Sequence, residues 1–128
     1  MISFNKLGNL GRLGNQMFQY ASLKGIAKNR GYKFTMPSVD SFGKNDYMVR
    51  TDPFNIYEVF KSIKPDEKGE TSNQILMEKV HGFDEDLFNN CPDNIDLFGY
   101  YQTPKYFEHI GDEIRLSLIH ISEPTRPY

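Results

Sequence analysis

Apolar and polar residues alternate at the start of the chain, and this period of two predicts a short strand over residues 2–7. Glycines punctuate the segment that follows. Residues 15–30 then contain no proline and many helix formers, and they end at Gly31, a residue that suits a helix terminus. Residues 32–36 predict a second strand. A strand, a glycine-rich turn, a helix and a strand together form the opening unit of a parallel sheet.

The expected helix is apolar on more than one side. Phe18 and Ile26 fall outside its main apolar arc, so we expect the helix to be covered by other elements in addition to a single sheet face. Lys24 lies within the arc, where its stem can be buried while its amine reaches water. The arc consists of Leu13, Met17, Tyr20, Ala21, Leu23 and Ala27.

The rest of the chain continues the α/β pattern less regularly. The remaining expected elements are a loop over 38–53, a helix over 55–63, an exposed linker over 66–73, strands over 74–80 and 96–102, and a helix over 105–115 with Pro104 at its first position. The predicted fold class is therefore α/β, with a parallel sheet and flanking helices.

Composition excludes several classes of function. With 15 Lys and Arg against 17 Asp and Glu, the formal net charge is −2, and no basic run could serve nucleic-acid binding. No apolar stretch reaches the ~18 residues of a membrane span, and the N-terminus lacks the pattern of a signal peptide. The single Cys91 suits a reducing compartment, and we interpret it as a bystander in preference to a catalytic nucleophile.

We interpret the C-terminal residues as a translated sequencing adapter. Residues 116–126 read Leu-Ser-Leu-Ile-His-Ile-Ser-Glu-Pro-Thr-Arg, which back-translates to a string similar to a transposon-library sequencing adapter. We therefore expect residues 1–115 to be the native part, truncated near Arg115, and residues 116–128 to be a non-native tail.

Candidate chemistry centres on the segment Gly11-Arg-Leu-Gly-Asn-Gln16. A glycine-rich turn that leads into a helix lets the backbone approach a ligand and directs helix N–H groups at an anion. Arg12 adds a planar cation, and Asn15 adds an amide. The glycine spacing is G-x-x-G-x-x-G, which is not that of a dinucleotide turn, so a purely structural tight turn explains it equally well.

Three other groups favour structural roles. Asp84-Glu85-Asp86 has the spacing of a metal-binding D-x-D, although acidic residues ahead of an apolar run more often form a helix N-terminus or a solvated loop. His81 and His109 have no partner at zinc-ligand spacing and are expected at the surface. The aromatic residues Phe98, Tyr100, Tyr101, Tyr106 and Phe107 could stack a sugar ring, but core packing is expected for most of them.

Two of these segments resemble a known family. Gly11-Arg-Leu-Gly-Asn-Gln-Met-Phe-Gln-Tyr-Ala21 resembles the N-terminal signature of the α-1,2-fucosyltransferases, glycosyltransferase family 11. Phe98-Gly-Tyr-Tyr-Gln-Thr-Pro-Lys-Tyr-Phe107 resembles that family's strand-ending Gly-Tyr-Phe-Gln-Ser-Glu-Lys-Tyr-Phe segment, and residues 84–88 and 92–97 resemble the acidic lead-in to it.

The resemblance implies transfer of L-fucose from GDP-fucose to the 2-hydroxyl of a galactoside by an inverting single displacement. It implies a Rossmann-like GT-B fold, of which this chain would be the N-terminal, acceptor-side part. Arg12, Gly14, Asn15 and Gln16 would line the cleft between the domains and bind substrate, with Asn15 the foremost candidate. No metal or other cofactor is expected, the catalytic base is not identified, and the location would be cytoplasmic, with a peripheral membrane position left open.

The family's donor-binding signature, His-x-Arg-Arg-x-Asp, does not occur in these 128 residues. We therefore expect the chain itself to be inactive. The alternatives are a non-catalytic carbohydrate- or nucleotide-binding module, and a nucleotide-dependent enzyme with an unrelated Rossmann unit. A sheet cut after its first strands would leave unpaired edges, so the isolated chain is expected to be molten or to aggregate. A cooperative thermal transition would instead favour the binding module.

Overall fold

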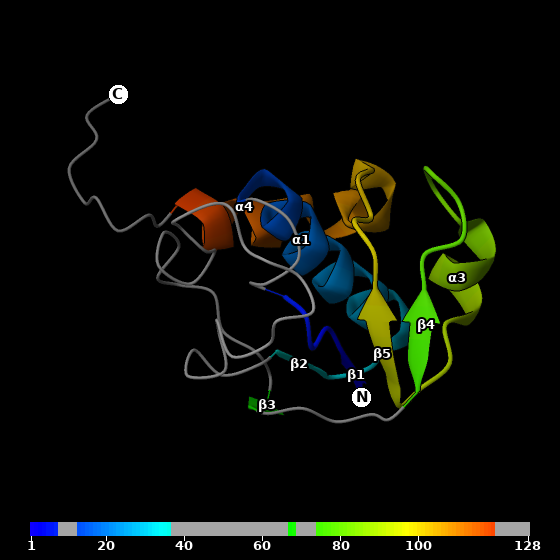
Figure 1. The fold of residues 1–128 in the computed structure, drawn as a ribbon. Helices are drawn as coiled ribbons and strands as arrows, with labels where there is room; N and C mark the ends of the chain where they lie inside the picture. Colours follow the sequence, from blue (N-terminus) through cyan, green and yellow to red (C-terminus); the bar gives the residue numbers. More distant parts are fainter. Residues whose placement is uncertain (8–12, 37–66, 69–73, 120–128) are drawn as a thin grey trace.

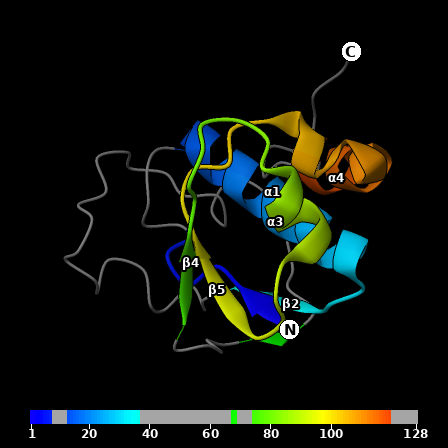
Figure 2. The ribbon, with the colours of Figure 1, turned by 90° about the vertical axis from the view of Figure 1, so that its right-hand side faces the viewer.

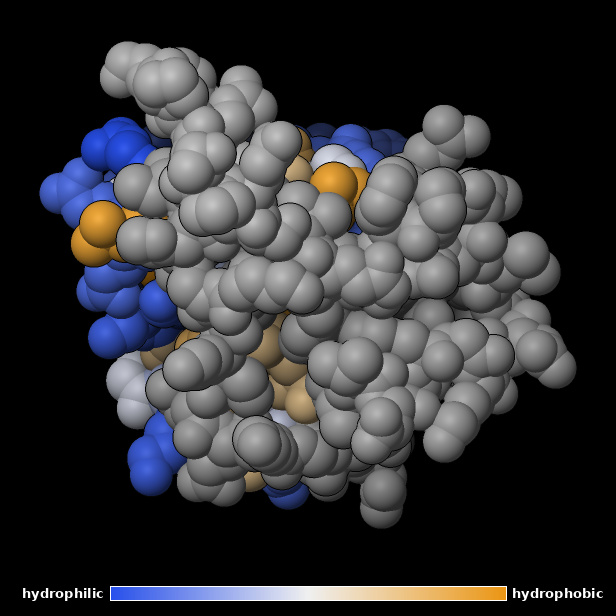
Figure 3. All heavy atoms as spheres, turned by 90° about the vertical axis from the view of Figure 1, so that its left-hand side faces the viewer, coloured by the Kyte–Doolittle hydropathy of each residue, from blue (hydrophilic) through white to orange (hydrophobic). Residues whose placement is uncertain are grey.

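The structure, a computed structural model, describes residues 1–7, 13–36, 67–68 and 74–119; the others are drawn in grey in Figures 1 and 3. The expected loop over 38–53 and the expected helix over 55–63 lie outside the described residues.

A parallel sheet forms one layer of the described fold, and the described helices lie together on one side of it (Figures 1 and 2). Its strand order is β3-β2-β1-β5-β4, and every pairing is parallel. In the central strand, Ile2 is in register with Phe34 on one side and with Ile95 on the other. The predicted α/β class with a parallel sheet is thereby confirmed. The strands are β1 (Ile2–Ser3), β2 (Phe34–Met36), β3 (Glu67–Lys68), β4 (Ile75–Met77) and β5 (Ile95–Phe98).

The strands are shorter than predicted: β1 ends at Ser3 and not at residue 7, β2 begins at Phe34 and not at residue 32, and β4 covers Ile75–Met77 and not residues 74–80. β1 ends early because a turn follows it, closed by a 3.0 Å hydrogen bond from Leu7 N to Phe4 O.

β3 lies inside the segment expected to be an exposed linker, where Glu67 is in register with Thr35. Backbone pairing needs no apolar side chains, so the charged composition of this segment concealed the strand. β5 ends at Phe98 because Gly99, with φ +151°, turns the chain out of the extended conformation.

The long helix α1 (Leu13–Arg30) confirms the predicted helix and its double coverage. It contacts β1 and β2 of the sheet. It also contacts α3 (Glu85–Asn90), because α1 and α3 lie on the same side of the sheet (Figure 2). Ile26, outside the main apolar arc, is fully buried, and Lys24 extends to place its Nζ 3.7 Å from Glu113 Oε2.

The predicted helix over 105–115 is wrong in its first half. Pro104–Tyr106 and Glu108–Ile110 form two 3₁₀ turns, η2 and η3, and the α-helix α4 runs over Gly111–Ile119. Phe107, with φ −137° and ψ 4°, separates the two 3₁₀ turns. The start was predicted well, since Pro104 follows Thr103, whose side chain caps η2.

The buried apolar residues form one continuous core between the sheet and these helices. β1, β2 and β5 contribute Ile2, Phe34, Met36, Ile95 and Leu97, and α1 contributes Tyr20, Ala21, Leu23, Ile26 and Ala27. The apolar residues Ile75 and Met77 of β4, by contrast, are each 57% exposed. Among the described residues, no helix has the length and apolar character needed to cross a membrane.

Candidate functional site

Two adjacent parallel strands, β1 and β5, have their carboxyl ends at the same edge of the sheet. The chain moves from β1 to β2 in one direction, whereas β5 and then β4 lie on the other side of β1. Ligands of open parallel sheets bind at the carboxyl ends of the strands. Here α1, which follows β1, and the 3₁₀ turn η2, which follows β5, contact each other and so lie on the same face of the sheet. At this edge of the sheet, β1 leads toward α1 and β5 leads into residues 99–102.

One stripe along α1 faces the segment that follows β5. Phe18 packs edge-on against Phe107 with ring centroids 6.0 Å apart, and Ser22 Oγ donates a hydrogen bond of 3.2 Å to the Tyr101 carbonyl. Positions 15, 18, 22 and 25 are spaced so that they share one face of a helix. The segments 11–21 and 98–107, distant in sequence, are therefore neighbours in the fold.

At the N-terminal end of this stripe, two side-chain amides meet. Gln102 Nε2 donates a hydrogen bond to Asn15 Oδ1; Gln102 is exposed and Asn15 is half-buried. The pair joins the first turn of α1 to the turn after β5. Each amide keeps a further donor or acceptor, so the pair could hold a hydroxyl group or a phosphate oxygen.

The other predicted site residues have different surroundings. Gly14 is exposed, and a Cβ placed there would meet no atom within 4 Å, so the backbone is open to a ligand. Gln16 is fully buried below the surface of α1. Arg12 lies outside the described residues. The structure thus brings Asn15 together with Gln102, a residue that was not among the predicted site residues.

A carboxylate fixes the turn that carries Gln102. Glu78, directly after β4, accepts hydrogen bonds from the backbone N–H groups of Tyr100 (3.0 Å) and Tyr101 (3.1 Å). Tyr101 has φ +51°, a left-handed conformation that costs a non-glycine residue about 1–2 kcal/mol. Such conformations persist only where the surroundings hold them, and they cluster at functional sites.

Most of the aromatic residues here serve packing, as predicted. Tyr101 and Tyr106 are fully buried, with ring centroids 5.7 Å apart, while Tyr100 is 39% exposed. Burial, with a smaller contribution from the Glu78 charge, raises the pKa of the Tyr101 phenol far above its ordinary value. Tyr101 is therefore protonated at neutral pH and is not a general base.

Three cavities formed by the described residues are not lined by Asn15 or Gln102, and one of them, of about 440 Å³, is lined by residues 108–113 and Arg115. One of about 90 Å³ is lined by residues of β4 and α3, including Met77 and Leu87, and it is too small for a nucleotide sugar. An apolar one of about 160 Å³ is lined by Met17, Phe18, Ala21, Phe107 and Ile114.

The acidic segment at residues 84–86 forms a helix N-terminus, which confirms the structural interpretation. Asp84 Oδ1 accepts a hydrogen bond from Leu87 N (3.2 Å), so Asp84 is the N-cap of α3, and Glu85 and Asp86 occupy its first turn. Within the described ranges, no group of three His, Cys, Asp or Glu side chains is placed to hold a metal ion. His81 and His109 are exposed, as predicted.

Cys91 is buried and poorly suited to nucleophilic catalysis. Its side chain is 0% exposed, and burial raises the pKa of the thiol from 9.0 to about 11, although the Arg30 guanidinium opposes the shift. A nucleophilic cysteine needs the reverse, a lowered pKa and access to solvent.

The raised pKa of Cys91 predicts a stability change at alkaline pH. Below pH 9 the thiol is protonated in both states; between about 9 and about 11 it ionises only in the unfolded chain, which is thereby favoured. Relative to Cys91→Ala, the wild-type chain should lose at most roughly 3 kcal/mol of unfolding free energy across this window. Urea titrations of both proteins from pH 8 to pH 11 measure the difference, and parallel curves would contradict the prediction.

Sequence reasoning missed Gln102 and Glu78 for different reasons. Gln102 lies within residues 98–107, the second segment that resembles the family, so the resemblance itself could have marked it as a candidate site residue. Glu78 lies in a segment interpreted only as a strand. Its role depends on the β4–β5 pairing, which sequence alone did not define.

Comparison of the chain with protein families, with curated proteins and with solved structures gives no match. The class that fold and site define is accordingly a parallel α/β unit with a polar pair at the carboxyl ends of two neighbouring strands.

Proposed function

We propose that this chain is the N-terminal, acceptor-side part of a galactoside α-1,2-fucosyltransferase of the GT-B type. The supporting observation is the contact between Asn15 and Gln102 at the carboxyl ends of β1 and β5. The two segments on which the family resemblance rests supply one residue each to this contact.

The proposed reaction moves the fucosyl group from GDP-fucose to a galactoside. The acceptor 2-hydroxyl attacks the anomeric carbon, GDP leaves from the opposite face, and the hydroxyl proton passes to a base. Such a reaction requires groups that orient the hydroxyl and groups that stabilise the departing diphosphate. In this proposal Asn15 binds sugar or phosphate, Gly14 permits close backbone approach, and Arg12 keeps the ligand contact predicted from the sequence. The predicted contact from Gln16 is not retained, because its side chain is fully buried.

Replacing Asn15 tests the site separately from the fold. Asn15→Ala is expected to weaken binding of GDP-fucose or of methyl β-galactoside by about tenfold or more, because a hydrogen bond to the ligand is lost. Stability should change little, since the side chain is half-buried and lies outside the core. Asn89→Ala, at an exposed position of α3, is the matched control. Calorimetric titration that finds equal affinities for both variants and the wild type would contradict the assignment.

The purified 128-residue chain is expected not to release GDP from GDP-fucose, with or without lactose, because the His-x-Arg-Arg-x-Asp segment is absent from it. Long-read sequencing of the source DNA across the Arg115 codon tests the proposed parentage. We expect the frame to continue into that segment. A source that encodes residues 116–128 followed by a stop would make binding, not catalysis, the working function.

The second candidate is a carbohydrate- or nucleotide-binding module without catalysis. The continuous core of the described residues supports it, because such a module has to fold without a second domain. The G-x-x-G-x-x-G spacing argues against an unrelated dinucleotide-dependent enzyme. A cooperative thermal transition of the isolated chain, with ligand binding but no turnover, would support this candidate.

A further inference from the structure

The turn after β5 has a backbone that its own residues do not favour. Gly99 has φ +151° and Tyr101 has φ +51°, so two of three successive residues lie at positive φ. Glycine adopts such a conformation freely, whereas a tyrosine does so only when its surroundings compensate.

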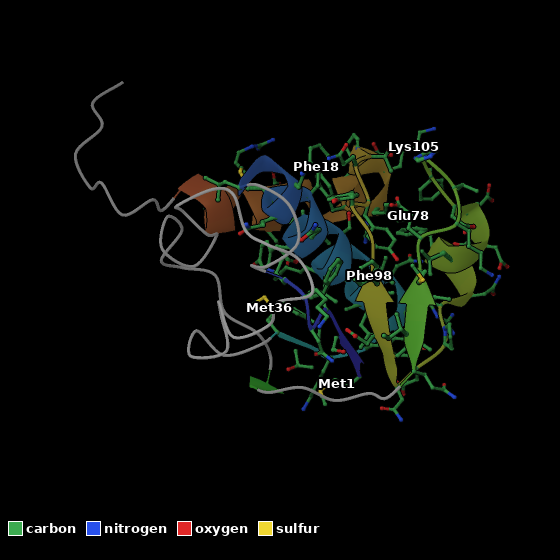
Figure 4. The ribbon with its side chains drawn as sticks, in the orientation of Figure 1. Met1, Phe18, Met36, Glu78, Phe98 and Lys105 are labelled. Atoms are coloured by element: carbon green, nitrogen blue, oxygen red, sulfur yellow. The ribbon has the colours of Figure 1, made fainter. Side chains whose placement is uncertain are left out.

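A single carboxylate supplies that compensation. Glu78 Oε1 accepts the Tyr100 N–H and Glu78 Oε2 accepts the Tyr101 N–H, so both oxygens are engaged by consecutive backbone donors. Consecutive N–H groups in a turn of this kind form a concavity that binds an anion. The carboxylate is itself held in place, because Glu78 N donates a 2.8 Å hydrogen bond to Phe98 O and so continues the pairing of β4 with β5. Figure 4 shows Glu78 at the carboxyl ends of these two strands.

The approach of Glu78 accounts for the glycine at position 99. A Cβ on Gly99 would lie 2.5 Å from Glu78 Cβ and 3.0 Å from its Oε1. Any larger residue would displace the carboxylate from the turn, quite apart from the unfavourable φ.

The buried side of the turn is anchored independently. The Tyr101 ring packs edge-on against Phe4 with centroids 6.0 Å apart, and the Tyr101 carbonyl accepts the hydrogen bond from Ser22 of α1. Glu78 holds one side of the turn, and Phe4 and Ser22 hold the other. Together these contacts fix the direction of the chain at the next residue, Gln102. Its amide then meets Asn15.

We propose that Glu78 is a positioning residue, which holds the Gly99–Tyr101 turn so that Gln102 stays paired with Asn15 and ready for ligand. The expected effect of Glu78 on ligand binding rests on the proposed function, whereas its effect on the conformation of the turn does not. Glu78 acts through Gln102 and is not assigned a contact with substrate.

Glu78→Gln tests the proposal, because it removes the charge and leaves one acceptor oxygen for two N–H groups. We expect faster hydrogen exchange at the Tyr100 and Tyr101 amides, and altered NMR signals from the side-chain amides of Gln102 and Asn15. Glu85→Gln makes the same charge change at an exposed position of α3 and should alter neither. Unchanged Gln102 and Asn15 signals in Glu78→Gln would overturn the proposal, as would unprotected Tyr100 and Tyr101 amides in the wild-type chain.

Ligand affinity supplies the second measurement. We expect Glu78→Gln and Gln102→Ala each to weaken binding of GDP-fucose or methyl β-galactoside by roughly tenfold. If Glu78 acts through Gln102, the variant with both substitutions should bind no more weakly than the weaker-binding single variant. If the two residues act independently, the fold-losses in affinity of the two single variants should multiply. In Gln102→Ala the Tyr100 and Tyr101 amides should stay protected from hydrogen exchange. A general loss of structure would instead expose both amides. If the wild-type chain binds neither ligand, the proposed function fails, and the amide signals still decide the role of Glu78.

Discussion

Gly25→Ala is expected to destabilise the chain by about 3 kcal/mol or more, although alanine is the better helix former. A Cβ at this position would lie 1.9 Å from the Tyr106 carbonyl oxygen, 2.8 Å from its carbonyl carbon and 2.9 Å from Phe107 Cα. All three are backbone atoms, so no side-chain rotation relieves the contact. α1 and the η2–η3 segment would have to move apart, which would also separate the residues that face each other along the stripe.

Gly111→Ala is the matched control, because a Cβ there meets no atom within 4 Å and the residue is already right-handed helical, with φ −53° and ψ −38°. This variant should be neutral or gain up to about 1 kcal/mol. Urea denaturation in a stabilising osmolyte such as sucrose measures both changes. Equal midpoints for the two variants would show that α1 and η2 do not approach as closely as the structure has them.

Asp96→Ala is expected to cost about 2–5 kcal/mol, because it leaves two donors beside β1 without their acceptor. Asp96 is 4% exposed, and its Oδ1 accepts hydrogen bonds from Asn5 N (2.7 Å) and Ser3 Oγ (3.1 Å). The bond to Asn5 fixes the direction in which the chain leaves β1 toward the glycine-rich segment.

Asp96→Asn keeps an oxygen at the Oδ1 position, so its loss should be clearly smaller than that of the alanine variant. Urea midpoints of the two proteins give the comparison, with hydrogen exchange at the Asn5 amide as a local measure. An alanine variant as stable as the asparagine variant would mean that the buried hydrogen bonds contribute nothing net.

The sequence predicted those parts of the fold that local pattern determines. α1 was found from its lack of proline and its terminal glycine, and β2 from the residues between that glycine and Pro37. β4 was found from its apolar residues, although Ile75 and Met77 are exposed. β3 was missed because an edge pairing of Glu67 and Lys68 depends on the neighbouring strand and not on its own composition. The break at Phe107 was missed because it depends on contact between η2 and α1, which is remote in sequence.

The sequence predicted the candidate site residues on α1 but not those on the segments after β4 and β5. Asn15 and Gly14 belong to a glycine-rich turn whose spacing before a helix suggests ligand binding, and the structure places both in the first turn of α1, with Gly14 exposed and Asn15 half-buried. Gln102 and Glu78 acquire their places from the strand order β1-β5-β4, in which strands distant in sequence become neighbours. No local pattern contains that order.

The most direct measurement for the central claim is an NMR titration of the wild-type chain with GDP-fucose and with methyl β-galactoside, using NAD as the comparison ligand. We expect at least one of the first two ligands to shift the side-chain amide signals of Asn15 and Gln102, with little change at Asn89 and no shift of comparable size from NAD. Shifts from NAD alone, or no shift at Asn15 and Gln102 with either sugar ligand, would contradict the claim.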